Sequence, residues 1–362
     1  MTVPPPLALM MELTHRCPLR CAYCSNPLAL EPASQELDTA SWRRVLDQAA
    51  AMGILQVHFS GGEPTVRSDL EDLVGHAASV GLYTNLITSG VLLDSLRIDA
   101  LAARGLEHVQ LGFQDCDPAG SESISGFRGG FERKIKVAGW LRQRGLALTV
   151  NAVMTRHNAV RAGALIDLAA ELGARRVEIA NVQYYGWGLL NRAALMPTRD
   201  QLIEMTAVVE AARQRLTGIM VIDYVIPDYY AKRPKACMGG WARRFVNVTP
   251  TGRVLPCHAA ETIPDLAFDR VCDRPLAEIW TDNMAFQKYR GIKGMPATCQ
   301  HCDHREIDWG GCRCQALALA GAADAVDPTC ERSPNHDEIQ AIAAREAMTG
   351  RTDFVYRQRS LG

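Results

Sequence analysis

The sequence has almost no excess charge of either sign, because its 39 lysines and arginines nearly balance its 40 aspartates and glutamates. Such a chain creates no electric field that would recruit nucleic acid or an anionic membrane. The amino terminus also lacks a basic segment before its short apolar run, which Glu12 interrupts. This pattern predicts neither a signal peptide nor a membrane span. We therefore expect a cytoplasmic protein that binds neither nucleic acid nor membrane.

Cysteine, in contrast, is abundant, with 12 residues in a chain of 362. Reducing pools keep cytoplasmic thiols free, so a disulfide framework is excluded and metal or redox chemistry becomes the expected use. Apart from Cys116, the cysteines fall into two groups. The first group is Cys17, Cys21 and Cys24, and the second comprises the eight cysteines from Cys237 to Cys330. Cysteines that served only to fill a core would be scattered along the chain.

The first half of the chain alternates short apolar or β-branched segments with longer amphipathic ones, which is typical of repeated βα units around a parallel sheet. The predicted strands are residues 8–14, 56–60, 83–89, 108–114, 148–154 and 176–183. Segments such as 39–53 and 160–173 repeat apolar residues at helical spacing and end at glycine. The pattern fits an α/β fold that is either a partial (β/α) barrel or an open doubly wound sheet.

The alternation of strand-like and helix-like segments ends at about Pro197. We expect a helix over residues 198–216, a strand over 219–226, two short strands around a Thr-Gly turn within 245–257, and a closing helix over 336–348. The sequence therefore predicts two domains. Residues 1–230 hold the βα units and a bridging segment, and residues 231–362 hold a cysteine-rich domain and a C-terminal extension.

The first cysteine group follows the first predicted strand, so it lies at the carboxyl edge of the sheet, where α/β folds place their ligands. Three closely spaced thiolates can hold three corners of a [4Fe-4S] cluster, which leaves one iron open for an exchangeable ligand. The alternative is a zinc ion with His15 as its fourth ligand.

A second motif, FSGGEP, ends the second predicted strand at Phe59 to Pro64. Its two glycines allow a ligand to approach the backbone closely, and the Glu63 carboxylate can accept a hydrogen bond from an ammonium group. Taken alone, a Gly-Gly pair is also typical of a simple turn.

Together, Cys-x3-Cys-x2-Cys after strand one, Tyr23 before its last cysteine, and Gly-Gly-Glu-Pro after strand two resemble the radical S-adenosylmethionine (SAM) superfamily. The resemblance implies a six-stranded partial barrel, a (β/α)6 variant of the TIM barrel, over roughly residues 8–200, in which the open iron of the cluster binds SAM. It further implies a SAM site in which Gly61, Gly62 and Glu63 meet the methionyl amine and Tyr23 meets the adenine. The remaining expected SAM contacts are Pro64, Arg128 and Asn151.

The second cysteine group, read from spacing alone, fits a zinc ribbon or two four-cysteine clusters. Its order is similar to the SPASM extension of peptide-modifying radical SAM enzymes, which binds two auxiliary iron–sulfur clusters, each [4Fe-4S] or [2Fe-2S]. This resemblance assigns one cluster to Cys237, Cys257, Cys312 and Cys314. It assigns the other to Cys299, Cys302, Asp308 and Cys330.

Asp308 is a departure from that pattern, because the SPASM register expects a cysteine six residues after Cys302. We expect Asp308 to be a ligand that tunes the potential of its cluster, and we count it as a catalytic residue. The alternative is a cluster that lacks this ligand and is completed by Cys272. Without such a role, Cys272 is expected to be a small core residue.

The segment from Glu178 to Thr198, together with Asp308, resembles the PqqE family of pyrroloquinoline quinone (PQQ) biosynthesis enzymes. The resemblance implies an oxidoreductase that joins the γ-carbon of a glutamate to a tyrosine ring in the precursor peptide PqqA. It also implies a peptide chaperone, PqqD, because no peptide-binding domain is expected before the first strand, and a low-potential donor such as flavodoxin. The alternatives are a SPASM enzyme acting on another peptide or protein side chain, and a non-catalytic zinc or redox-sensing protein.

Overall fold

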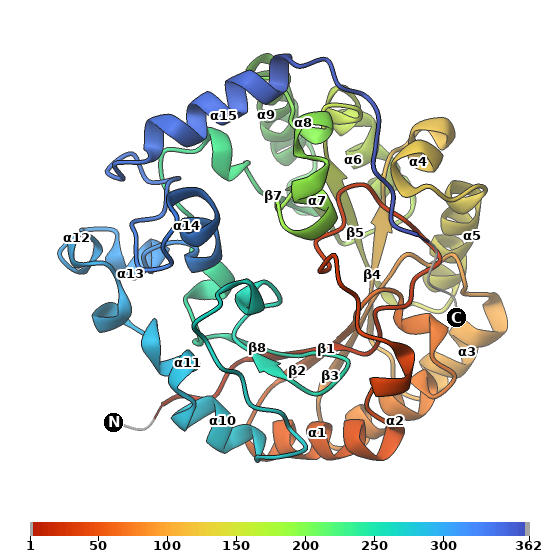
Figure 1. Cartoon of the computed structure of the whole chain (residues 1–362). Helices are drawn as coiled ribbons and strands as arrows, with labels where there is room; N and C mark the ends of the chain where they lie inside the picture. The colour runs from red at the N-terminus through yellow and green to blue at the C-terminus, as the bar shows by residue number, and fades with distance from the viewer. Residues whose placement is uncertain (1–2, 359–362) are drawn as a thin grey trace.

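The computed structural model describes residues 3–358 and builds them around one curved β-sheet (Figure 1). The strand order is β7-β6-β5-β4-β3-β2-β1-β8-β9, and every neighbouring pair is parallel except β8 with β9. The strands are β1 (Ala8–Glu12), β2 (Gln56–Ser60), β3 (Tyr83–Thr88), β4 (His108–Phe113), β5 (Ala147–Met154), β6 (Arg176–Asn181), β7 (Val221–Tyr224), β8 (Phe245–Val248) and β9 (Val254–Leu255).

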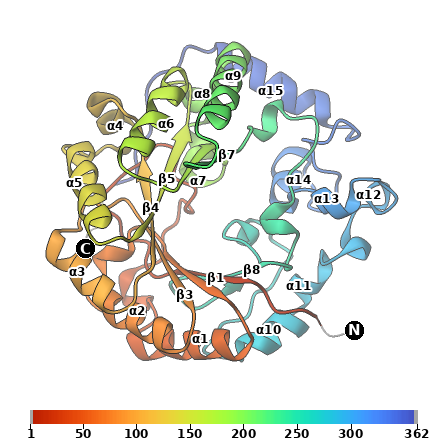
Figure 2. The ribbon, with the colours of Figure 1, turned by 180° about the vertical axis from the view of Figure 1, so that it is seen from behind.

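Strands β1 to β7 follow one another across the sheet in chain order, whereas a doubly wound sheet would reverse direction at a switch point. Figures 1 and 2 show the connecting helices on the outer side of the curved sheet. They are α1 (Thr39–Ala51), α2 (Leu70–Ser79), α3 (Ser95–Ala103), α4 (Pro118–Ser125), α5 (Gly130–Gln143), α6 (Ala162–Glu171) and α9 (Arg199–Arg215). The predicted partial barrel is therefore confirmed, and the doubly wound alternative is excluded.

Helix α1 illustrates how the local sequence sets these elements. The side chain of Asp38 accepts a hydrogen bond from the backbone N–H of Ser41 at 2.8 Å, which caps the first turn. The buried face of the helix repeats at three- and four-residue spacing and consists of Trp42, Val45, Leu46 and Ala49. These side chains belong to the same apolar core as the sheet, so the helix is fixed against the barrel wall.

The predicted strands are all present, with ends that differ from the sequence expectation by at most two residues. The segment at 219–226 forms the shorter strand β7, which pairs with β6. The two short strands at 245–257 form the antiparallel pair β8 and β9. Sequence patterns did not predict that β8 would also pair with β1 in parallel, with Ala8 opposite Phe245. The cysteine-rich half of the chain therefore extends the barrel sheet.

The C-terminal half consists mainly of short helices and turns beside the barrel, drawn in blue and teal in Figure 1. Its helices are α10 (Leu276–Asp282), α11 (Met284–Lys288), α12 (Ala297–Gln300), α13 (Arg305–Asp308), α14 (Arg313–Ala320) and α15 (His336–Met348). Two short helices, α7 (Gly186–Leu190) and α8 (Arg192–Leu195), precede α9. Arg192 of α8 and Glu346 of α15 form a two-pronged ion pair at 2.7 Å, which attaches the last helix to the barrel.

Single-turn 3₁₀ helices lie in the connections at Ala33–Gln35, Pro64–Val66, Ala159–Arg161, Asp228–Tyr230, Cys237–Gly239, Ala260–Thr262 and Ile292–Gly294. Within residues 3–358, no helix combines the length and the apolar character needed to cross a bilayer. One continuous apolar core runs from the barrel, where it includes Trp42 and Phe113, to Trp280 and Phe286 in the C-terminal half.

Candidate active site and cluster sites

A cavity of about 460 Å³ lies at the carboxyl ends of the barrel strands. Cys17, Cys21 and Cys24 line it from the connection between β1 and α1 (residues 13–38), which we call the cysteine loop. Gly61 and Gly62 line it from the end of β2. Tyr23 and Asn151 contribute to the same wall. The structure thus brings together most of the side chains that the sequence assigns to the SAM site.

The three thiols are all free, and burial has the largest effect on their pKa values. It raises the pKa of Cys21 to about 11 and raises the pKa values of Cys17 and Cys24 above their usual range. The Arg357 guanidinium acts in the opposite direction on each of these pKa values. Iron deprotonates a thiol that coordinates it. Three free thiols that line one cavity are therefore a donor set that fits an iron–sulfur cluster.

The two glycines after β2 pack directly against the cysteine loop. A Cβ atom on Gly61 would lie 2.4 Å from the backbone oxygen of Thr14, and one on Gly62 would lie 2.5 Å from that of Arg16. The backbone N–H of Gly62 donates to the Thr14 oxygen at 2.6 Å. Only glycine fits this close approach, so the motif shapes the loop that carries the thiols as well as lining the cavity.

Glu63 is completely buried, and its carboxylate accepts five hydrogen bonds. One oxygen accepts from the backbone and hydroxyl of Thr65, at 3.1 and 2.7 Å, and from the hydroxyl of Thr88 at 2.7 Å. The other accepts from the backbone and hydroxyl of Ser89, at 2.8 and 2.5 Å. Thr88 and Ser89 line the cavity, whereas Glu63 lies behind them. The carboxylate therefore holds the end of β3 in place.

Several polar residues of the cavity were not predicted from the sequence. The Gln114 side chain donates to the Tyr23 hydroxyl at 2.9 Å and approaches the Cys21 sulfur at 3.9 Å. Buried Lys134 donates to the Gln114 side-chain oxygen, and burial lowers the pKa of this lysine to about 8. Gln114 directly follows β4, so its position at the strand end was the available signal. Lys134 lies within α5, and nothing in the sequence indicated that it would lie beside the cavity.

Asn151 donates to the Glu178 carboxylate at 2.6 Å, and both side chains line the cavity. Burial raises the pKa of Glu178. Two other sequence candidates lie elsewhere. Arg128 lines a separate depression on the outside, with Arg20 and Tyr356. Pro64 is buried at the start of a 3₁₀ helix and does not line the cavity.

The second cysteine group forms two sites. In the first, Cys237, Cys257 and Cys312 line a cavity of about 170 Å³. Each of these thiols, and that of Cys314, interacts with at least two others of the four. The hydroxyl of Tyr185 lies 3.0 Å from the Cys312 sulfur. The four thiols that the sequence grouped therefore adjoin one another, as a donor set for one cluster.

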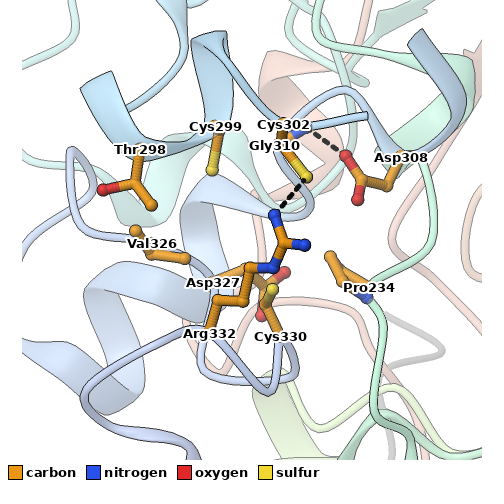
Figure 3. A pocket seen from close by; sticks show the side chains of 10 residues that line it. All are labelled: Pro234, Thr298, Cys299, Cys302, Asp308, Gly310, Val326, Asp327, Cys330 and Arg332. Carbon is orange, nitrogen blue, oxygen red and sulfur yellow. Dashed lines mark hydrogen bonds between the residues drawn. The ribbon is translucent and has the colours of Figure 1, made fainter. Parts of the chain in front are cut away.

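In the second site, Cys299, Cys302, Cys330 and Asp308 line one pocket (Figure 3). The Asp308 carboxylate accepts a hydrogen bond from the backbone N–H of Gly310 at 2.9 Å, and Arg332 donates to the Cys302 sulfur at 3.4 Å. Cys272, in contrast, is exposed, so the expectation that it fills the core is wrong. It lies in a turn before α10, where its side chain is not covered.

Comparisons with known proteins agree with this geometry. The model of the radical SAM superfamily matches residues 11–169, and the model of an iron–sulfur cluster-binding domain, SPASM, matches residues 237–303. The solved structure of Streptococcus suis SuiB bound to S-adenosylmethionine is similar, with a TM-score of 0.74, 21% identity, and coverage of 91% of this chain and 78% of SuiB. The structure of anSMEcpe with bound AdoMet gives a TM-score of 0.67 at 14% identity, over 94% of this chain and 96% of that one.

Curated relatives are much closer in sequence. A PqqA peptide cyclase of Xanthomonas campestris pv. campestris (strain 8004) is 60% identical over 99% of this chain and 95% of its own length. A PqqA peptide cyclase of Granulibacter bethesdensis is 55% identical over the same shares. With this identity along nearly the whole sequence, the chain belongs to the PqqA peptide cyclase family of radical SAM enzymes.

Proposed function

We propose that this enzyme makes a carbon–carbon cross-link in the precursor peptide PqqA, between the γ-carbon of a glutamate and the ring of a tyrosine, as a step of PQQ biosynthesis. The observation that carries the proposal is the cavity at the carboxyl ends of the barrel strands, which three free thiols face. Two further cysteine sites lie in the same chain. The relatives are named PqqA peptide cyclases, and this name indicates the substrate.

The residues that would hold the cofactors follow from this arrangement. Cys17, Cys21 and Cys24 would hold the cluster that binds SAM. The two auxiliary clusters would be held by Cys237, Cys257, Cys312 and Cys314, and by Cys299, Cys302, Asp308 and Cys330. When bound, SAM and its cluster supply a 5′-deoxyadenosyl radical, which can remove a hydrogen from a carbon too weakly acidic for a side-chain base.

The chain itself supplies several polar side chains to the wall around the reacting groups. Tyr23 and Gln114 are already hydrogen-bonded to each other, so neither side chain needs to reorganise when a ligand enters. The Asn151 amide and the Glu178 carboxylate likewise form a hydrogen-bonded pair in the wall. Fixed side chains of this kind orient SAM and the peptide and keep water away from the radical chemistry.

We further propose that PqqD presents the peptide and that flavodoxin, or a similar low-potential protein, supplies electrons. The test is to reconstitute the enzyme without oxygen and to incubate it with SAM, flavodoxin, PqqD and PqqA. We expect a PqqA product that is lighter by the mass of two hydrogen atoms, with fragments that join glutamate to tyrosine. Omitting PqqD or flavodoxin should lower the yield.

Other outcomes would contradict parts of this proposal. Unchanged PqqA, together with cleavage of SAM, would indicate a SPASM enzyme with a different peptide or protein substrate. Zinc in place of iron and sulfide after reconstitution would indicate a non-catalytic protein.

A further inference from the structure

The C-terminal strap, which we define as residues 349–358, runs from α15 back to the cysteine loop. In Figure 1 it is the dark blue segment that descends beside the red loop after β1. The side chain of Asn191 exchanges hydrogen bonds with the backbone of Val355 at 2.7 and 2.9 Å, and it also donates to the backbone oxygen of Ala22 at 3.0 Å. One side chain therefore connects the strap to the loop that carries the thiols.

Two aromatic contacts add to this attachment. Phe354 packs edge-on against His157, with ring centres 5.0 Å apart. Arg20 of the cysteine loop lies over the ring of Tyr356 at 5.2 Å. The strap is therefore held at residues 354–356, directly before Arg357.

Arg357 lies at the end of this path and is 6% exposed. Its guanidinium donates to the backbone oxygens of Leu19 at 2.6 Å, Cys17 at 3.2 Å and His15 at 3.5 Å. These three carbonyls belong to alternate residues of the cysteine loop. A planar, rigid fork of donors is suited to holding several acceptors in one arrangement, which a lysine cannot reproduce.

The Nε–H of Arg357 has no hydrogen-bond partner among residues 3–358, although it is buried. No carboxylate in that part of the chain forms an ion pair with this arginine, and Arg357 is one of the residues that line the SAM cavity. A buried cationic donor without an acceptor costs free energy, so a ligand that brings an acceptor gains affinity.

We propose that Arg357 completes the active site from the far end of the chain by fixing the cysteine loop and donating from its guanidinium to a carboxylate in the cavity. Both ligands of the proposed reaction carry such a group, namely the methionyl carboxylate of SAM and the glutamate of the peptide. The inference rests on the proposed function, because that function places SAM and PqqA in this cavity.

The test uses the full-length reconstituted enzyme and the variants Arg357→Gln and Arg357→Lys. Arg351→Gln is the matched control, because Arg351 is on the same strap but exposed. SAM and PqqA are titrated separately, and the perturbation by SAM of the electron paramagnetic resonance spectrum of the reduced cluster is recorded. We expect Arg357→Gln to weaken one of the two ligands about tenfold or more, as for the loss of a hydrogen bond to a charged group. Arg357→Lys should recover part of this affinity, and Arg351→Gln should match the wild type.

Weaker binding of SAM, with PqqA unchanged, would assign the carboxylate to SAM, and the reverse would assign it to the peptide. Wild-type affinity for both ligands in a folded Arg357→Gln variant would overturn the inference. The carboxylate contact is also overturned if Arg357→Lys binds both ligands as weakly as Arg357→Gln, because lysine keeps the positive charge and loses only the planar fork that holds the loop. Failure of the wild-type enzyme to bind SAM would instead contradict the proposed function.

Discussion

Glu63 is a motif residue that does not line the cavity but contacts two residues that do, Thr88 and Ser89. The sequence suggested a direct hydrogen bond to SAM, whereas the carboxylate is fully buried and already accepts hydrogen bonds from Thr65, Thr88 and Ser89. A glutamine has only one acceptor oxygen, so it would place an amide N–H against one of these donors. If glutamine cannot replace Glu63, the site needs both carboxylate oxygens as hydrogen-bond acceptors.

We predict that Glu63→Gln weakens SAM binding more than it lowers the iron content of the enzyme. Each hydrogen bond to the charged carboxylate contributes about 1.5–3 kcal/mol, so the end of β3 should shift and distort the cavity wall. A SAM titration and iron analysis measure the two effects, with Glu204→Gln on the exposed face of α9 as control. Unchanged SAM affinity would show that the end of β3 has no part in the site.

Asp308 provides a second prediction at this scale. Replacing it by alanine should open one auxiliary cluster, whereas replacing it by cysteine should lower the potential of that cluster, because a thiolate is the softer and more strongly donating ligand. SAM cleavage should persist in both variants, and the yield of cross-linked peptide should fall. Spectroscopy and peptide mass measurement on Asp308→Ala, Asp308→Cys and Cys272→Ala test this together. Altered cluster spectra for Cys272→Ala alone would mean that Cys272 is the ligand.

Among the elements, the cysteine loop depends most on its neighbours. It has no regular structure apart from one 3₁₀ turn, so its shape is set by the Gly61–Gly62 turn beside it and by polar contacts such as that of Arg67 with the Leu13 backbone oxygen at 3.3 Å. A loop supported in this way is sensitive to small changes in the turn.

We predict that Gly62→Ala causes loss of the loop cluster, because the added Cβ would lie 2.5 Å from the backbone oxygen of Arg16 and the loop would have to move. Iron content and SAM affinity should both fall. Gly139→Ala in α5 is the control, since an added Cβ there meets no atom within 4 Å. The control substitution should raise the free energy of unfolding by about 0.5–1 kcal/mol, as for glycine to alanine inside a helix. A normal iron content in Gly62→Ala would contradict the close approach.

At the scale of the whole molecule, the three cysteine sites are separate. We predict that replacing Cys17, Cys21 and Cys24 together by alanine abolishes SAM cleavage but leaves the auxiliary iron bound. Anaerobic iron and sulfide analysis measures this, with Cys116→Ala as the control outside both groups. Loss of all iron from the triple variant would show that the sites are coupled.

Much of this molecule could be predicted from local patterns. The strand at 56–60 was predicted with the bounds of β2, because apolar Val57 and Phe59 alternate with polar residues within one short segment. The structure buries both apolar side chains. The first cysteine group was predicted from its close spacing for the same reason, whereas the division of the second group into two sites followed from its resemblance to the SPASM extension. Contacts between segments that are far apart in the sequence could not be predicted. Nothing in residues 245–248 indicates that β8 pairs with β1, and nothing near Arg357 indicates that it reaches Cys17. Such contacts depend on the folded barrel.

The pairing of β1 with β8 bears on the order in which the protein is made. Strand β1 leaves the ribosome early, but its outer neighbour begins only at Phe245, and Arg357 follows Cys17 by 340 residues. At the usual rate of synthesis this interval is on the order of a minute or less. Until the chain is complete, the loop thiols lack some of their final neighbours, Arg357 among them. Iron delivery to this site is therefore expected to follow completion of the chain, and oxidants have their best access to these thiols during translation.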